Sequence, residues 1–357
     1  MLELMILYDY KKHFATKLIE TKSGRIEGNF NLEKLKKLFE NKSYKVICQS
    51  FSEVDLYREY KGTYVVYASS EDKGQFYKQY VEDVILALKE KGAIIIPEFK
   101  WFRAHSNKVF QELLRKGFEN ENLKKPTAFT LGNYKELDTI INQIKYPAVV
   151  KMATGAGSSG VKLAKNEKEL KKITFKMMDH HYRDCTQSLF LVFCLWIKRL
   201  LRRMTGRRVG NETIFNHVLS NRIIIQNFIP ELTGDYKVLH FNGKYFVLHR
   251  NNRPDDFRAS GSGLFEFPDY TDEVKEVLKF AIQVVNEIKM PLESLDIACN
   301  NEGCYLIEFQ CVFFGPYTLQ YAPWCFVKSG DSLLKVPGKF DLEEEYSSAI
   351  DKYIRGI

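Results

Sequence analysis

The first hundred residues alternate short apolar runs with segments whose apolar residues recur at helical spacing. Four runs have the length and composition of strands, namely Met5 to Tyr8, Lys45 to Cys48, Tyr64 to Tyr67 and Ala93 to Ile96. Helical spacing occurs from Leu32 to Phe39 and from Tyr80 to Leu88. Strands that alternate with helices indicate a parallel sheet covered on both faces. We therefore expect an α/β domain over residues 1–105.

The rest of the chain continues this plan with one interruption. Residues 106–230 are expected to form a second α/β domain, and the strand-rich residues 231–357 a third. Residues 175–221 interrupt the pattern, because an apolar run is followed there by a cluster of basic residues. The cluster consists of Lys198, Arg199, Arg202, Arg203, Arg207 and Arg208. We interpret this segment as a helical insertion.

A loop with almost no side chains follows the apolar strand that ends at Lys151. Its glycines accept backbone conformations that other residues resist, so N–H groups can approach a polyphosphate closely. Dinucleotide-binding and P-loop motifs both lead into a helix, but this chain continues Val161-Lys162-Leu163, which alternates like a strand. The sequence therefore predicts two strands joined by a glycine flap that handles a nucleotide. The alternative is a simple hairpin turn.

Two strands joined by a turn at Asn300 to Gly303 bring three oxygen-bearing side chains to one patch. Pairing about the turn sets Asp296 opposite Glu308, and strand alternation puts Gln310 on the face of Glu308. Two facing carboxylates among apolar neighbours need a cation, a proton or a basic partner. Magnesium takes a few protein oxygens completed by phosphate and water, which this patch can supply. The alternative is two exposed carboxylates on a solvated face.

A second hairpin is predicted about the favoured two-residue turn Asn242-Gly243. Pairing there puts Asp235 opposite Arg250, with Lys237 on the same face. That face is apolar near the turn and charged at its far end, where a phosphate can meet Lys237 and Arg250. Asp235 and Arg250 can equally form only a cross-strand ion pair, which contributes little if it is exposed.

These features, in this order, resemble the ATP-grasp superfamily, in particular the branch with the ribosomal-protein glutamate ligase, glutathione synthetase and D-alanine ligase. The resemblance covers Asn107 to Pro316 apart from the insertion. It implies an ATP-grasp fold of the α/β (α+β) class, with an N-terminal parallel-sheet pre-ATP-grasp domain. The implied cofactors are ATP and Mg²⁺, with two ions expected and Mn²⁺ as a substitute.

The resemblance also implies roles for single residues. The implied nucleotide ligands are Lys108, Lys151, Gly155, Gly157, Ser158, Ser159, Gly160, Gln226, Asn227, Phe228, Ile229 and Glu231. Among them, residues 226–229 would contact the adenine and Glu231 the ribose. The implied catalytic cations are Lys237, Arg250 and Arg258, and the implied metal ligands are Asp296, Glu308 and Gln310. Gln310 stands where the family usually has asparagine, and the extra methylene moves its amide oxygen by about one bond length.

A carboxylate–amine ligase is the activity that the resemblance implies. A substrate carboxylate would attack the ATP γ-phosphorus, and an amine would capture the acyl phosphate to form an amide. An amino acid, a dipeptide or a uronic acid on a surface-polysaccharide precursor would fit as substrate. The alternatives are an ATP-grasp kinase that phosphorylates a hydroxyl, and an ATP-binding or membrane-associated scaffold without turnover. Acceptor candidates, by position only, are Glu71, Asp72, Arg103, His105, Arg258 and Tyr317.

Composition narrows the partners and the compartment only a little. The 357 residues carry a net charge of +8, which suits ATP, nucleic acid or an anionic membrane equally. We expect small-molecule substrates and no nucleic acid, with residues 188–208 as a contact for either a second subunit or a membrane surface. The longest apolar run, Leu189 to Ile197, is shorter than the roughly 20 residues of a spanning helix. Seven cysteines without a Cys-x-x-Cys pair, and no signal peptide before Leu2, predict a reducing, cytoplasmic location without a disulfide framework.

Overall fold

The chain forms two compact units. The computed structural model describes residues 1–14, 18–21, 24–27, 30–69, 75–155, 160–182, 189–206, 216–252, 263–312, 314–330 and 332–356. Unit 1 comprises Met1–Pro126, Ala156–Ser158 and Ile229–Ile357. Unit 2 comprises Thr127–Gly155 and Ser159–Phe228. The three domains expected from the sequence, with bounds after residues 105 and 230, stay a prediction.

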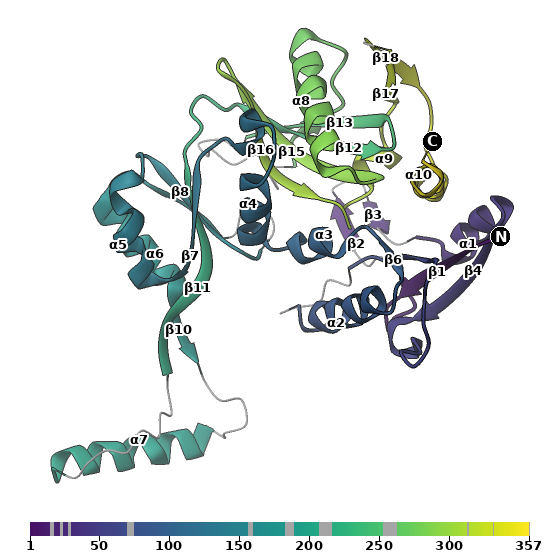
Figure 1. Cartoon of the computed structure of the whole chain (residues 1–357). Helices are drawn as coiled ribbons and strands as arrows, with labels where there is room; N and C mark the ends of the chain where they lie inside the picture. The colour runs from purple at the N-terminus through teal and green to yellow at the C-terminus, as the bar shows by residue number, and fades with distance from the viewer. Residues whose placement is uncertain are drawn as a thin grey trace. The chain divides into compact units, whose positions relative to one another are not determined.

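Unit 1 begins with a parallel sheet in the order β4-β1-β5-β6 (Figure 1). Its strands are β1 (Leu2–Tyr8), β4 (Tyr44–Ser50), β5 (Thr63–Val66) and β6 (Ile94–Ile96), and its main helices are α1 (Leu32–Asn41) and α2 (Phe76–Glu90). Alternation along β1 sends Leu4 into the core that contains α1 and Met5 into the core that contains α2. The expected N-terminal parallel sheet with a helix on each face is confirmed.

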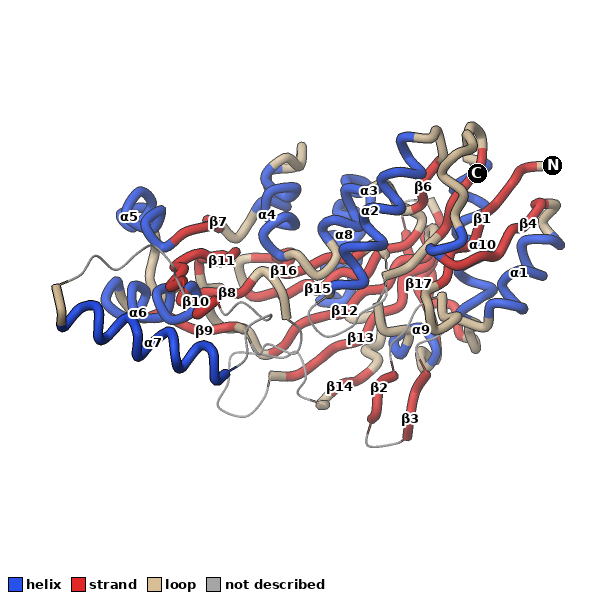
Figure 2. The backbone as a smooth tube through the Cα atoms, turned by 90° about the horizontal axis from the view of Figure 1, so that it is seen from below, coloured by secondary structure: helices blue, strands red, loops and turns tan. Residues whose placement is uncertain are grey.

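The second sheet of unit 1 is antiparallel, in the order β16-β15-β12-β13-β17-β18, with β14 paired to β13. The long strands β12, β13, β15 and β16 run side by side (Figure 2). The strands are β12 (Gly234–Phe241), β13 (Lys244–Asn251), β14 (Phe265–Glu266), β15 (Leu292–Asn300), β16 (Gly303–Gln310), β17 (Trp324–Ser329) and β18 (Ser332–Pro337). This mixture of parallel and antiparallel sheets confirms the expected α/β (α+β) class.

Strand alternation gives the antiparallel sheet two different faces. Val238 and Leu295 pack with Val277 of α8 (Asp272–Ile288) under one face. Leu239 and Phe246 point to the other face, where they join the core that contains α10 (Leu342–Arg355). Residues of β12 on this second face that lie farther from the turn are polar, and they form the site described below. The remaining elements of unit 1 are β2 (Leu18–Thr21), β3 (Gly24–Glu27), α3 (Phe99–Ala104), α4 (Lys108–Lys116) and α9 (Tyr317–Gln320).

Unit 2 is a sheet in the order β10-β11-β8-β9, with β7 on the other side of β11. Its elements are β7 (Ala128–Asn133), α5 (Leu137–Ile140), β8 (Ala148–Met152), β9 (Val161–Ala164), α6 (Glu167–Met178), β10 (Asp179–Tyr182), α7 (Leu189–Met204) and β11 (Asn216–Asn227). Leu170 of α6 packs against Val150 and Ile223 in the core of this unit. The two strands predicted on either side of the glycine loop are confirmed as the antiparallel pair β8 and β9.

A disulfide joins Cys299 to Cys304 across the β15–β16 hairpin, so the expectation of no disulfide is wrong at this pair. The two residues are register partners with Cα atoms 4.1 Å apart. Hairpin pairing places two β-carbons side by side, which a search for Cys-x-x-Cys spacing does not detect. No helix among the described residues is long and apolar enough to cross a bilayer.

Candidate functional site

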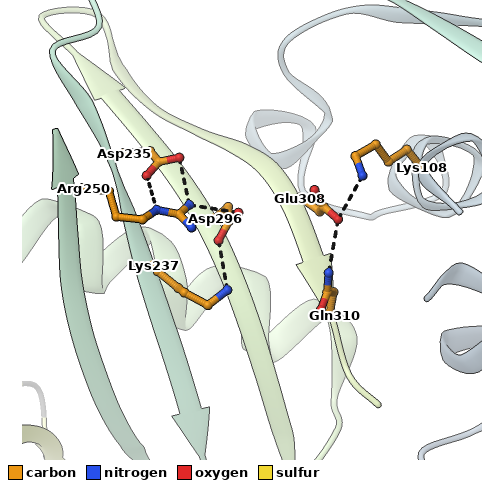
Figure 3. Close-up of polar contacts among 7 residues, drawn as sticks. All are labelled: Lys108, Asp235, Lys237, Arg250, Asp296, Glu308 and Gln310. Carbon is orange, nitrogen blue, oxygen red and sulfur yellow. Dashed lines mark hydrogen bonds and ion pairs between the residues drawn. The ribbon is translucent and has the colours of Figure 1, made fainter. Parts of the chain in front are cut away.

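Arg250 of β13 and Asp235 of β12 form a bidentate ion pair at the polar end of the second sheet face (Figure 3). The guanidinium donates from Nε to Oδ1 of Asp235 at 2.6 Å and from Nη2 to Oδ2 at 2.8 Å. The register predicted from the Asn242-Gly243 turn is therefore confirmed. Planar two-point pairing of this kind fixes the orientation of the guanidinium as well as its position.

Asp296 of β15 joins the same cluster from the neighbouring strand (Figure 3). Its carboxylate lies 3.0 Å from Nη2 of Arg250 and 3.4 Å from Nζ of Lys237. These three side chains are only 15% to 19% exposed. Two cations and two carboxylates thus neutralise one another in a partly dehydrated patch. The contacts of Arg250 with Asp235 and Asp296 use its Nε and Nη2 atoms.

The two carboxylates that share this guanidinium have pKa values shifted in opposite directions. Burial alone would raise the pKa of Asp296, but the charges of Arg250 and Lys237 outweigh it and lower the pKa to about 2. Burial raises the pKa of Asp235, and the nearby Asp296 charge adds to this rise against the opposing charge of Arg250. Asp296 is therefore the group that keeps its negative charge most firmly, as a metal ligand must.

Glu308 and Gln310 of β16 form a second polar group with Lys108 (Figure 3). Lys108 is the first residue of α4, where the side chain of Asn107 caps the helix. Its Nζ lies 3.3 Å from Oε1 of Glu308, and Nε2 of Gln310 donates to the same oxygen at 3.2 Å. Asp296 and Glu308 are register partners, as the sequence predicted. The implied metal ligands and Lys108 therefore come together in unit 1.

The side chains of Asp296, Glu308 and Gln310 offer oxygen atoms of the kind that bind a magnesium ion. Mg²⁺ prefers oxygen ligands in octahedral geometry and binds through one or two carboxylates together with phosphate oxygens and water. Asp296 and Glu308 on adjacent strands meet that requirement, with the amide of Gln310 beside them. No group of three or more acidic, histidine or cysteine side chains that could hold a metal occurs in the described part of the chain. The residues fit an ion whose shell is completed by phosphate, and their role as ligands stays a prediction.

Lys151 and Gln226 meet in unit 2. Nζ of Lys151 on β8 donates to Oε1 of Gln226 on β11 at 2.6 Å. Gln226 is 3% exposed, and within the described residues neither its Nε2 nor Oδ1 of Asn227 has a hydrogen-bond partner. Buried polar side-chain atoms without a hydrogen-bond partner are uncommon, and each one costs free energy unless water or a ligand satisfies it. Both atoms belong to the segment that the sequence assigned to adenine.

The backbone of this segment is partly occupied by other contacts. The amide of Asn227 donates to the carbonyl of Thr127 at 3.0 Å, and that of Phe228 to the carbonyl of Pro147 at 3.4 Å. Ile229 is buried. Glu231 in unit 1 is exposed and has a φ of 58°, which is uncommon for a residue with a side chain. Adenine binding by backbone groups of 226–229 and ribose binding by Glu231 remain predictions.

Two glycines of the predicted flap lie in described positions. Gly155 has a φ of 115°, a conformation that other residues strongly disfavour. A β-carbon on Gly160 would lie 2.9 Å from Cγ of Met152, so packing against β8 requires glycine there. This is a structural reason for Gly160 in addition to the predicted phosphate contact. The candidates that lie outside the described residues are Gly157, Ser158, Ser159, Arg258, Glu71 and Asp72.

The remaining acceptor candidates have partners of their own in unit 1. Nη1 of Arg103 donates to Glu82 at 2.7 Å. His105 is 1% exposed, and Tyr317 stacks on Tyr321 with ring centroids 4.6 Å apart. A role in acceptor binding stays a prediction for each of them. Asp235 is not among the site residues that the resemblance implies, although the Asn242-Gly243 turn already predicts its position opposite Arg250.

One family model matches part of the chain. The family described as "Carbamoyl-phosphate synthase L chain, ATP binding domain" matches residues 110–193. No curated protein sequence matches the chain.

Solved structures resemble the whole chain at low identity. D-cycloserine synthetase is 11% identical with a TM-score of 0.52, covering 98% of this chain and 99% of that one. A RimK domain ATP-grasp protein from Sphaerobacter thermophilus DSM 20745 is 8% identical with a TM-score of 0.48, covering 99% and 100%. D-alanine–D-alanine ligase from Bacillus anthracis is 13% identical with a TM-score of 0.46, covering 99% and 97%. The first likeness shows the fold alone, and the two below 0.5 add no weight to it.

Proposed function

We propose that the chain is an ATP-grasp protein and, on that premise, an ATP-dependent carboxylate–amine ligase. The observation that carries the proposal is the cluster of Asp296, Arg250 and Lys237 beside Glu308 and Lys108. It combines anionic oxygens for a cation with cations for a phosphate, which is the combination that phosphoryl transfer from ATP requires. D-cycloserine synthetase, which the chain resembles in fold, carries a synthetase name, and this supports ligation over other uses of ATP.

The proposed reaction has two steps. A substrate carboxylate attacks the γ-phosphorus of ATP, which gives an acyl phosphate and ADP. An amine then attacks the acyl carbon, phosphate leaves and an amide forms. Neither step needs a protein nucleophile, because the transferring phosphoryl group itself activates the carboxylate.

In this scheme the residues of unit 1 stabilise the negative charge of the phosphoryl group that transfers. Lys237 and Arg250 neutralise the phosphoryl group that transfers, and Asp235 holds the guanidinium of Arg250 in a fixed orientation. When bound by Asp296 and Glu308, magnesium would screen the phosphate oxygens and orient the γ-phosphate. With a cation bound at Glu308, Lys108 would contact a phosphate oxygen instead of this carboxylate. Arg258 is proposed as a further cation near the acceptor.

Unit 2 is proposed to contribute contacts to the nucleotide. Lys151 binds a phosphate oxygen, and the unpaired amide atoms of Gln226 and Asn227 bind the base. Phe228 and Ile229 pack on the base, and Glu231 of unit 1 accepts from the ribose. The loop that contains Gly155, Gly157, Ser158, Ser159 and Gly160 covers the phosphates. Mn²⁺ is expected to replace Mg²⁺, since both prefer oxygen ligands.

The decisive experiment is a screen of carboxylate and amine pairs for ADP release. The carboxylates are amino acids, dipeptides and uronic acids, and mass spectrometry identifies the product. Hydroxylamine added in place of the amine should give a hydroxamate with the right carboxylate. ADP release with a phosphorylated hydroxyl and no hydroxamate would establish a kinase instead. No ADP from any pair, with Mg-ATP still bound, would establish a binding protein.

A further inference from the structure

Helix α7 of the insertion exposes large apolar side chains. Those that are at least one third exposed are Phe193 (57%), Trp196 (53%), Ile197 (37%), Leu200 (45%), Leu201 (55%) and Met204 (77%). A patch of this kind on a globular protein marks a surface that binds something. None of these six belongs to the core cluster of unit 2 among its described residues.

The exposed apolar residues lie on one side of the helix. At about 100° per residue, the six occupy a continuous arc of roughly 140°. Lys198, Arg202 and Arg203 lie on the rest of the circumference. The helix sequence from Leu189 to Met204 contains four basic residues and no acidic one. From Trp196 to Met204 the helix is thus amphipathic, and all of its charged residues are basic, whereas residues 189–197 are apolar throughout.

Charge decides which partner this surface fits. A second copy of α7 would bring like charges together, which opposes pairing between identical helices. An anionic lipid surface attracts the same cations and accepts the apolar arc among its acyl chains. The length of 16 residues, about 24 Å at 1.5 Å per residue, is too short to cross the bilayer but suits a helix lying in its plane. Tryptophan is enriched at the membrane–water interface, which fits Trp196.

We propose that α7 binds the surface of an anionic lipid bilayer. The helix lies parallel to the membrane, with its apolar arc from Trp196 to Leu201 in the headgroup and acyl boundary. Lys198, Arg202 and Arg203 contact lipid phosphates. The lipid is a docking partner that holds the protein at the membrane, and this proposal does not depend on the proposed ligase activity.

Vesicle flotation of the full chain without nucleotide tests the proposal. The protein should float with mixed phosphatidylcholine–phosphatidylglycerol vesicles and far less with phosphatidylcholine alone. Each cation near the surface contributes about fivefold to partitioning, so Arg202→Gln/Arg203→Gln should weaken it about 25-fold. Leu200→Ala/Leu201→Ala should weaken it by at least tenfold. High salt should weaken binding because it screens the surface potential.

A matched control lies on another helix of the same unit. Lys168 and Lys172 of α6 are exposed, so Lys168→Gln/Lys172→Gln removes equal charge without touching α7. This variant should partition nearly as the unaltered protein does. If the α6 and α7 variants lost vesicle binding equally, total charge and not α7 would cause the binding. That result would overturn the proposal.

The fluorescence of Trp196 gives an independent readout. Trp196 is exposed in the structure whereas Trp101 is 4% exposed, so a blue shift with anionic vesicles should come from Trp196 and disappear in Trp196→Phe. Protein that stays in the unbound fraction overturns the proposal. In that case a dimer in analytical ultracentrifugation that Leu200→Ala/Leu201→Ala dissociates would identify a second copy as the partner. Monomers throughout would indicate a different protein partner.

Discussion

Arg250 contacts two carboxylates and lowers the pKa of both, yet the pKa values of the two groups shift in opposite directions. It binds Asp235 through two hydrogen bonds and Asp296 through one nitrogen. Lys237 forms an ion pair with Asp296, but its charge lowers the pKa of both carboxylates. The pKa of Asp296 is consequently lowered and that of Asp235 is raised by burial. The two residues should therefore respond differently to the same substitution.

Asp296→Asn should lower the free energy of unfolding by about 2 kcal/mol at pH 7. The folded-state pKa of about 2 lies below the ordinary 3.8, so ionised Asp296 stabilises the fold above pH 4. This contribution disappears as the pH falls from 4 to 2. Asp235→Asn should cost less at pH 7, because burial already disfavours its charge. Urea unfolding at several pH values measures both, and a larger cost for Asp235→Asn would contradict this account.

Glu308→Gln should reduce magnesium-dependent ADP release by at least a hundredfold. The substitution keeps the shape but removes the charge that binds the cation. Gln310→Asn should change the rate less than tenfold, because the amide of Gln310 already donates to Glu308 and is uncharged. Glu302→Gln, at the exposed turn of the same hairpin, is the control. Rates titrated against Mg²⁺ decide, and equal effects at positions 308 and 310 would assign Gln310 a direct role.

At the scale of elements, two hairpins could be predicted in register because their turns are local signals. Asn242-Gly243 fixes every pair between β12 and β13, including Asp235 with Arg250. Contacts between distant segments could not be predicted in this way. Lys108 and Glu308 are 200 residues apart in sequence, and Lys151 and Gln226 are 75 apart. Only tertiary packing brings these pairs together. The family resemblance named the four residues singly but did not predict the two pairs.

Gly234 begins β12 beside the ion-paired cluster, and no sequence pattern marked it. A β-carbon there would lie 2.3 Å from the carbonyl oxygen of Arg250 and 2.8 Å from Nε2 of His249. Gly234→Ala should therefore separate β12 from β13 at the charged end and lower the free energy of unfolding by about 1–3 kcal/mol. Gly132→Ala in β7 is the control, since its β-carbon would come no closer than 3.8 Å. Chemical denaturation of both variants measures the difference, and equal stability would refute the clash.

The disulfide should stabilise the β15–β16 hairpin modestly. Its loop is short, with a sequence separation of 5, so reduction should lower the free energy of unfolding by about 2 kcal/mol. Unfolding with and without reductant gives this value. Cys299→Ser/Cys304→Ser should be insensitive to reductant, whereas Cys325→Ser, which removes a free thiol, should retain the sensitivity. The same unfolding curve for the unaltered chain in both conditions would mean that the bond does not form in solution.

At the scale of the whole molecule, local patterns revealed the order of the elements but not how they share cores. One hydrophobic cluster contains Leu4 and Phe39 of the parallel-sheet region together with Leu239 and Tyr346 of the antiparallel region. Both sheets consequently belong to unit 1, although the sequence of neither region predicts that it packs against the other. Unit 2 has a separate cluster built from Val150, Leu170 and their neighbours.

Separate cores allow a final prediction about ligand binding. Mg-ATP at a hundred times its dissociation constant should add about 2.7 kcal/mol to the stability of the parts that it contacts. Lys108→Ala in unit 1 and Lys151→Ala in unit 2 should each reduce the rise in midpoint temperature that Mg-ATP causes. Lys172→Ala on exposed α6 should leave that rise unchanged. Calorimetry with and without Mg-ATP provides the measurement.

The two variants separate the contributions of the two units. Mg-ATP could raise the midpoint temperature of Lys151→Ala fully but not that of Lys108→Ala. That result would restrict nucleotide binding to unit 1 and would exclude Lys151 and Gln226 as ligands. Loss in both, with chelation of Mg²⁺ giving the same loss in the unaltered chain, is the expected result. This expectation follows from the proposal that Lys108 of unit 1 and Lys151 of unit 2 both bind phosphate and that carboxylates of unit 1 bind the cation.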